Sequence, residues 1–301
     1  MMKKGIRALL VVALLAAITV GALRWKLSGL EHEQVSGDVY MLQGLGGNVA
    51  VLATSEGAVV VDTMTFAFQG EAIRELAEEL GGGPVQAILN THYHLDHSHG
   101  NPGFDGAPEV VATERTLHHM LTRDADFWEG DDRKLPNTTF ETRHEMSIGG
   151  KTIRAVHPGR GHTDGDLVVL FVEDRVLHTG DLFFNKRYPN IDLEAGGSVR
   201  EWAATVDRVL ELDFDRVIPG HGEATDRAGL RAFRDFMAEL WEQGQRAAAA
   251  GWTLKKTLAM TRLELDEGYD TMEIPLLLKL DRDFVVSRAW QEASGAVTAD
   301  P

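Results

Sequence analysis

The chain has 301 residues, 44% of them hydrophobic, which suits one large domain with an ample core or a domain with an extension. Its formal net charge of −16 argues against a nucleic-acid partner, because a phosphate binder needs a basic face. The absence of cysteine excludes disulfides, thiolate metal ligands and a cysteine nucleophile. Cysteine content therefore gives no information about the cellular compartment of this protein.

The N-terminal residues combine a basic start with an apolar run. Lys3, Lys4 and Arg7 precede uncharged apolar residues from 8 to 23, an order typical of an export signal. Because this run is just shorter than the ~20 residues that span a bilayer, a cleaved signal and a retained anchor both stay open. A buried core helix is the third alternative. We therefore assign residues 1–28 to a signal peptide or membrane anchor and expect a periplasmic, secreted or membrane-anchored protein.

Strand and helix patterns follow in alternation. Strands are expected at residues 39–42, 48–54 and 58–61, and a hairpin at residues 142–148 and 152–157. Residues 71–80 place their apolar side chains on one face and precede three glycines, which predicts an amphipathic helix. Residues 114–123 also favour a helix. The polar stretch 124–137 is either a lid over a site or a disordered connection.

The most specific chemical pattern is T-H-Y-H-L-D-H at residues 91–97. In extended backbone, residues two apart point the same way, so His92 and His94 can bind one metal ion. Asp96 and His97 follow where the chain begins to turn, so they can address a second ion. The apolar residues 87–89 predict a buried strand that would present these ligands at its C-terminal end. A histidine-rich surface patch without a role is the alternative reading.

Three further candidate ligands occur in turns beside apolar, strand-like runs. These are His162 in G-H-T-D-G-D, Asp181 in H-T-G-D and His221 in P-G-H-G. Turns at strand ends are where a rigid scaffold presents functional groups, so all three are candidate ligands.

The C-terminal quarter is expected to be helical. A helix is predicted from Asp226 to Ala250, ended by Gly251. Pro275 is predicted to open another helix, with Leu276, Leu280 and Phe284 at four-residue spacing. Both are expected to pack on the main domain.

The motifs H-x-H-x-D-H, G-H-T, G-D and G-H-G, in this order, resemble those of the metallo-β-lactamase-fold hydrolases, over roughly residues 35–222. The resemblance implies an α/β protein with a four-layer αββα sandwich and a C-terminal helical extension. It implies a catalytic domain at residues 29–225 and packed helices at residues 226–301.

The same resemblance implies a ligand set for two ions. The first would be held by His92, His94 and His162, and the second by Asp96, His97 and His221, with Asp181 bridging both. Asp62, beneath the metals, would orient a histidine ligand, although a simple turn aspartate at a strand end is the alternative. Two zinc ions per chain are expected, and this thiolate-free set would also accept iron or manganese.

These residues predict hydrolysis of a small molecule. A metal-bound hydroxide would attack an ester, thioester, lactone or β-lactam carbonyl, with Asp96 both binding metal and accepting a hydrogen bond from the attacking water. The pattern is similar to that of glyoxalase II and the lactonases, but lactonases of this family place a tyrosine where this chain has Phe184. An iron-dependent persulfide dioxygenase and an exported, metal-stabilised binding or accessory protein are the alternatives.

Residues near the predicted ligands are candidates for holding the substrate. They are Tyr93, within the histidine motif, and Lys186, Arg187 and Tyr188, which follow Asp181. Ordinary solvation of a charged loop is the alternative for the latter group. No nucleic acid is expected as a partner, a membrane only through the N-terminal segment, and the oligomeric state is left open.

Overall fold

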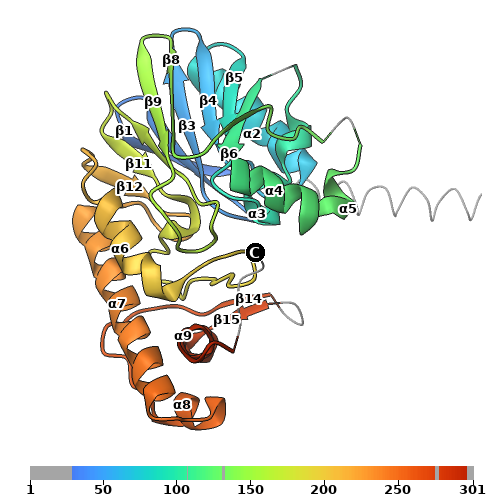
Figure 1. Ribbon diagram of the computed structural model, residues 1–301. Coiled ribbons are helices and arrows are strands. Elements are labelled where there is room, and N and C mark those ends of the chain that lie inside the picture. Colours follow the sequence, from blue (N-terminus) through green and yellow to red (C-terminus); the bar gives the residue numbers. More distant parts are fainter. Residues whose placement is uncertain (1–28, 107, 131–132, 275–277, 297–301) are drawn as a thin grey trace, which may run out of the picture.

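Two β-sheets lie face to face at the centre of the protein (Figure 1). The computed structural model describes residues 29–106, 108–130, 133–274 and 278–296. The first sheet has the strand order β1 (Glu31–Ser36), β2 (Val39–Gln43), β3 (Val49–Thr54), β4 (Gly57–Val61), β5 (Val85–Leu89), β6 (Glu109–Thr113) and β7 (Thr138–Phe140). The second has the order β13 (Thr225–Asp226), β12 (Arg216–Ile218), β11 (Val176–His178), β10 (Val168–Phe171), β9 (Lys151–Val156) and β8 (Arg143–Ile148).

Helices cover the outer faces of both sheets and form the C-terminal part of the chain. They are α2 (Ala67–Gly81), α3 (Leu95–Ser98), α4 (Glu114–Thr122), α5 (Ala125–Trp128), α6 (Val199–Val209), α7 (Arg227–Ala249), α8 (Leu254–Met260) and α9 (Arg282–Ser294). Two 3₁₀ turns, η1 (Asn101–Gly103) and η2 (Gly180–Leu182), and a hairpin of β14 (Met272–Ile274) and β15 (Leu278–Leu280) complete the fold.

Alternation of side chains along the strands produces the layers. In β4, Val59 and Val61 point into the cluster between the two sheets, whereas Val60 joins the cluster beneath α2. A third apolar cluster lies between the second sheet and α6, α7 and α9. Three clusters between four layers confirm the predicted αββα sandwich, because each sheet buries both of its faces.

Most predicted elements are confirmed, and local chemistry fixes their ends. Helix α2 begins earlier than predicted, at Ala67, and ends at Gly81; the next residue, Gly82, caps it with a φ of 64° that suits glycine. The β8–β9 hairpin turns at Gly149 and Gly150, both with positive φ. Helix α7 is capped by the Asp226 side chain, which accepts hydrogen bonds from two backbone N–H groups of the first turn.

The prediction of one helix running from Pro275 is wrong where the structure describes it. Residues 275–277 lie outside the described residues, but Leu280 belongs to strand β15 and pairs with Met272 of β14. Helix α9 begins only after Asp281, whose carboxylate accepts a hydrogen bond from the backbone N–H of Phe284. The four-residue spacing of apolar residues therefore crosses a strand and a helix N-cap.

The C-terminal helices share their apolar cluster with the main domain. Phe233 of α7 and Val285 of α9 lie in the same cluster as Trp202 of α6 and Leu177 of β11. The proposed boundary at residues 225 and 226 stays a prediction. The predicted signal or anchor at residues 1–28 lies outside the described residues. Within the described ranges, no helix has both the length and the apolar character needed to cross a membrane.

Candidate metal centre

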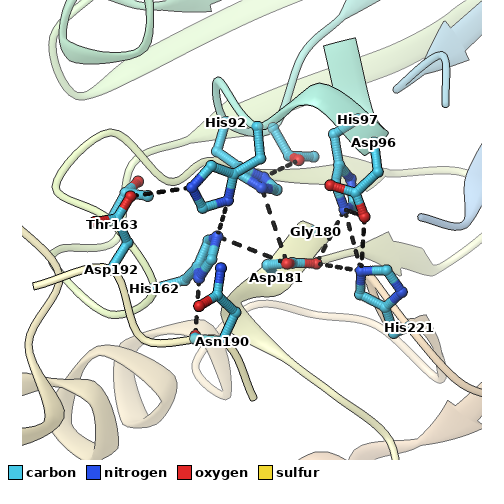
Figure 2. Close-up of polar contacts among 12 residues, drawn as sticks. His92, Asp96, His97, His162, Thr163, Gly180, Asp181, Asn190, Asp192 and His221 are labelled. Atoms are coloured by element: carbon cyan, nitrogen blue, oxygen red, sulfur yellow. Dashed lines mark hydrogen bonds and ion pairs between the residues drawn. The ribbon is translucent and has the colours of Figure 1, made fainter. Parts of the chain in front are cut away.

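All predicted ligands come together at one edge of the sandwich (Figure 2). His92 follows β5, and Asp96 and His97 lie on the short helix α3 that comes next. Asp181 and His221 follow the parallel strands β11 and β12, so both leave the second sheet at the same edge. His162 precedes β10, which runs antiparallel to β11, and a strand of that direction begins where its neighbour ends.

The first group consists of His92, His94, His162 and Asp181, whose candidate ligand atoms all lie within 4.8 Å of one another. Nδ1 of His94 lies 2.7 Å from Nε2 of His162. Oδ2 of Asp181 lies 3.6 Å from Nε2 of His162 and 3.9 Å from Nε2 of His92. Four donor atoms thus surround one point.

The second group consists of Asp96, His97 and His221, and it adjoins the first through Asp181. Nε2 of His221 lies 3.3 Å from Oδ2 of Asp96 and 3.4 Å from Nε2 of His97. The other oxygen of Asp181, Oδ1, lies 3.1 Å from Nε2 of His97 and 3.5 Å from Nε2 of His221. One carboxylate therefore presents one oxygen to each group, an arrangement in which Asp181 could bridge two ions.

Burial and neighbouring charges keep His92, His162 and Asp181 of the first group in the form that binds metal. Burial, and then the adjacent imidazoles, lower the pKa of His92 well below 6.5. Burial and His94 lower the pKa of His162 to about 4, so both rings are neutral at pH 7. Burial alone would raise the pKa of Asp181, but His97 and His221 lower it to about 2.

The buried polar atoms fit two cations. Nε2 of His92 is buried and has no hydrogen-bond partner, although Nδ1 of the same ring is 3.0 Å from the Thr91 hydroxyl. Buried polar atoms are normally paired, and this nitrogen, 3.9 Å from Oδ2 of Asp181, is placed where a metal ion would fit both atoms. Burial would lower the pKa of His97, yet the carboxylates around it raise the pKa well above 6.5. This excess of negative charge is what a bound cation neutralises.

The outer nitrogens of the histidines are held by three further residues. Oδ2 of Asp62 lies 2.7 Å from Nδ1 of His97, and Oδ1 accepts a hydrogen bond from the backbone N–H of Thr91. Nδ1 of His162 lies 2.9 Å from the carbonyl oxygen of Asn190, and Nε2 of His94 lies 3.0 Å from Oδ2 of Asp192. Such contacts fix which nitrogen faces the metal. Asp62 thus contacts the outer nitrogen of His97, and its orienting role stays a prediction.

Two glycines allow backbone to approach the ligands closely. A Cβ at Gly47 would lie 2.1 Å from Cε1 of His97, and one at Gly220 would lie 2.0 Å from Oδ1 of Asp181. Asn48 joins these two loops, since its side chain donates hydrogen bonds to the carbonyls of Pro219 and Gly222. The backbone of both loops therefore packs directly against His97 and Asp181.

The predicted substrate contacts have other partners in this structure. The Tyr93 hydroxyl donates a 2.6 Å hydrogen bond to Asp192. The Tyr188 hydroxyl donates to Asp266, and Nζ of Lys186 donates to the carbonyl of Glu267. Burial raises the pKa of Tyr188, as does its contact with Asp266, so its hydroxyl stays protonated.

Lys186 and Tyr188 were predicted to contact substrate. In the structure both side chains bind the C-terminal segment, because tertiary packing brings residues 266–270 against this loop. The substrate role of Arg187 stays a prediction. Sequence reasoning missed Asn190, Asp192 and Asn48. Nothing in their local sequence distinguishes them from ordinary loop residues, and only their long-range contacts do.

Comparison with known proteins identifies the family. The fold and the shared-carboxylate site first define an αββα protein with two adjoining His/Asp groups. Residues 42–221 match the family model of the metallo-beta-lactamase superfamily, and this protein belongs to that superfamily.

Individual relatives differ in their activities. The alpha subunit of 2,4-dinitroanisole O-demethylase from Nocardioides sp. (strain JS1661) is 30% identical over 72% of this chain and 64% of its own length. The type 2 metallo-beta-lactamase of Bacillus cereus is 24% identical over 62% of this chain and 70% of its own.

Solved structures share the fold. A double mutant of the sec-alkyl sulfatase PisA1, from Pseudomonas sp., has a TM-score of 0.70 and 18% identity over 91% of this chain. The likeness covers 52% of that sulfatase, so this chain spans about half of it and just under two thirds of the demethylase subunit. A metallo-beta-lactamase from Pontibacter korlensis covers 70% of this chain with a TM-score of 0.58.

Proposed function

We propose that this protein is an exported hydrolase that uses two divalent metal ions, zinc by preference, to cleave a small carbonyl substrate. The observation that carries the proposal is the pair of adjoining ligand groups that share Asp181, with the buried, unpaired Nε2 of His92 facing Oδ2 of that carboxylate. A structural zinc site needs four ligands and no second group. The superfamily match supports the same conclusion, because metal-dependent hydrolysis occurs among the relatives.

The chain's own residues divide the work. Two bound cations would supply Lewis acidity, which lowers the pKa of water towards ~7 and polarises the scissile group. Asp181 keeps the two groups adjacent through its two oxygens. Asp96 has a side chain that is 31% exposed, so one carboxylate oxygen can accept a hydrogen bond from the attacking water and orient it. Asp96 is the candidate catalytic residue for that reason.

An apolar rim beside the second group favours a substrate that carries an apolar portion. Leu45 is 48% exposed, Phe66 40% and Leu95 51%. The carbonyl of Leu45 accepts a hydrogen bond from the Thr65 hydroxyl, which brings the Leu45 loop next to Phe66. Gly47 of the same loop donates its N–H to the carbonyl of Asp96. Clustered exposed apolar side chains at a site mark a binding surface.

An activated aryl ether is a second candidate substrate, favoured by the 30% identity to the dinitroanisole O-demethylase subunit. The deciding experiment is a substrate screen on the zinc-reconstituted protein, with and without a chelator. It would compare a short and a medium acyl ester, a thioester, a lactone, a chromogenic β-lactam, an alkyl sulfate and 2,4-dinitroanisole. Chelator-sensitive turnover of a carbonyl substrate supports the proposal.

Turnover that persists without metal, or equally in a His162→Ala variant, contradicts the mechanism. Oxygen uptake with a persulfide, and none of these hydrolyses, would instead favour the dioxygenase alternative. Export is tested separately by fractionation and N-terminal sequencing of the mature protein. A chain found only in the cytoplasm would refute that part of the proposal.

A further inference from the structure

The two ring nitrogens of His94 face different partners. Nδ1 lies 2.7 Å from Nε2 of His162, inside the first group, and Nε2 lies 3.0 Å from Oδ2 of Asp192, outside it. A neutral imidazole carries its proton on one nitrogen and its lone pair on the other. A carboxylate at Nε2 selects the tautomer with Nε2–H, which leaves the lone pair of Nδ1 directed at the metal position.

Asp192 is held in this orientation from several sides. The Tyr93 hydroxyl donates to the same oxygen, Oδ2, at 2.6 Å, and the backbone N–H of Ala195 donates to Oδ1 at 3.0 Å. The backbone N–H of Asp192 donates to the carbonyl of His162, another ligand of the first group. Both the side chain and the main chain of Asp192 thus contact ligands of one metal.

The other two histidines of this group rest on neutral acceptors. Nδ1 of His162 faces the carbonyl of Asn190, and Nδ1 of His92 faces the Thr91 hydroxyl. Only Asp192 brings a negative charge to an outer nitrogen of the first group among the described residues. A carboxylate partner raises the basicity of the ligand more than a neutral acceptor does.

We propose that Asp192 is a positioning residue for the first metal: it fixes the tautomer and orientation of His94, and Tyr93 keeps the carboxylate in place. The inference rests on the proposed function, because it requires that the first group bind metal. Tyr93 is then part of the metal-site support, which accounts for its hydroxyl without a substrate contact.

Asparagine at position 192 tests the idea with little change in shape. One oxygen of Asp192 accepts from both Tyr93 and His94, and the other accepts from Ala195. An amide has only one acceptor oxygen, so its NH₂ group must face either the Ala195 N–H or the two side-chain donors. Asp192→Asn therefore either disrupts the contact to His94 or leaves the backbone N–H of Ala195 without its acceptor.

The experiment measures the two stepwise zinc affinities of the full chain by competition with a chromogenic chelator. His162→Ala, which removes a ligand of the first group, identifies the binding step that belongs to it. We expect Asp192→Asn to weaken that step about 10- to 100-fold and to leave the other step within about twofold. Asp174→Asn is the matched control, because Asp174 is a carboxylate that binds Lys151 and the Asp38 N–H away from the metal groups.

The outcomes separate the two claims. If the wild-type protein binds no zinc, the proposed function fails and the inference with it. If the wild-type protein binds two ions and Asp192→Asn binds both equally well, the inference alone fails. Parallel loss of both steps, or an equal loss in Asp174→Asn, would show a merely structural role and also overturn it.

A measurement on the wild-type protein avoids dependence on a folded variant. Histidine nitrogen NMR of the zinc-loaded chain should show His94 with its proton on Nε2 and a strongly downfield N–H signal. His162 should carry its proton on Nδ1 instead. A proton on Nδ1 of His94 would contradict the proposed role of Asp192.

Discussion

Replacing Gly220 by alanine should displace Asp181, the carboxylate that both metal groups share. The backbone at Gly220 lies outside the left-handed region, so alanine adds no conformational strain there. The added Cβ would lie 2.0 Å from Oδ1 of Asp181 and 2.7 Å from the carbonyl carbon of Gly180. The backbone cannot move away easily, because the N–H of Gly220 donates to the carbonyls of Gly180 and Phe183.

The expected magnitudes follow from this overlap. An overpacked methyl group costs about 1–3 kcal/mol, which lowers the melting temperature by roughly 2–10 °C in a protein of this size. A displacement of ~1 Å in a catalytic group can cost on the order of 100-fold in rate. Because Asp181 serves both groups, both zinc affinities should fall, unlike the single step affected by Asp192→Asn.

Three measurements test this prediction: thermal unfolding of the metal-free chain, zinc content by elemental analysis, and turnover of whichever substrate the screen finds. Gly251→Ala is the control. Its φ of 63° makes alanine unfavourable, but no atom lies within 4 Å of the added Cβ, so it should lose stability without losing metal. A Gly220→Ala protein with two zinc ions and undiminished turnover would refute the reasoning.

Three other expectations follow from the same contacts. His162→Ala should lose the first zinc ion and nearly all turnover, measured by elemental analysis and kinetics, since it removes one donor of that group; retention of both would exclude His162 as a ligand. Tyr188→Phe should lower the free energy of unfolding by about 1–2 kcal/mol in denaturant titrations, because it leaves the Asp266 carboxylate without its donor, and an unchanged midpoint would contradict that. Burial lowers the pKa of His178 below 6.5, and Nδ1 of the neutral ring accepts a hydrogen bond from the Gly180 N–H. The stability that neutral His178 contributes is therefore complete above pH 6.5 and is lost as the pH falls below 6.5. Metal-free His178→Gln should therefore lose less stability than the wild-type chain between pH 7.5 and 5; equal losses would show that His178 does not cause the slope.

Local sequence was sufficient to predict most of the elements and to single out the candidate metal ligands that the structure brings together. The nearly continuous apolar runs in β3 and β4 supply both faces of a buried strand, and the glycines at 81–83 and 149–150 mark where helix α2 and strand β8 end. Ligand residues at strand-end turns were recognisable because their side-chain types and spacing suit metal binding before any packing is known.

Local sequence failed where two patterns overlapped. The apolar spacing after Pro275 satisfies a helical period, yet Leu280 pairs across the β14–β15 hairpin. Asp281 then starts helix α9 by accepting the N–H of Phe284. The cap and the cross-strand pair prevailed over periodicity, which by itself does not separate a short helix from a strand followed by a helix.

The sequence alone therefore singled out the candidate site: which histidine and aspartate side chains could donate to metal, and in which turns they lie. Tertiary structure alone decided what holds those side chains. Asp192 meets Tyr93 across 99 residues, and Tyr188 meets Asp266 across 78. Hydrogen-bond partners at such separations are selected by the packing of sheets and loops, because a polar group that becomes buried must pair with whatever donor or acceptor the fold places beside it.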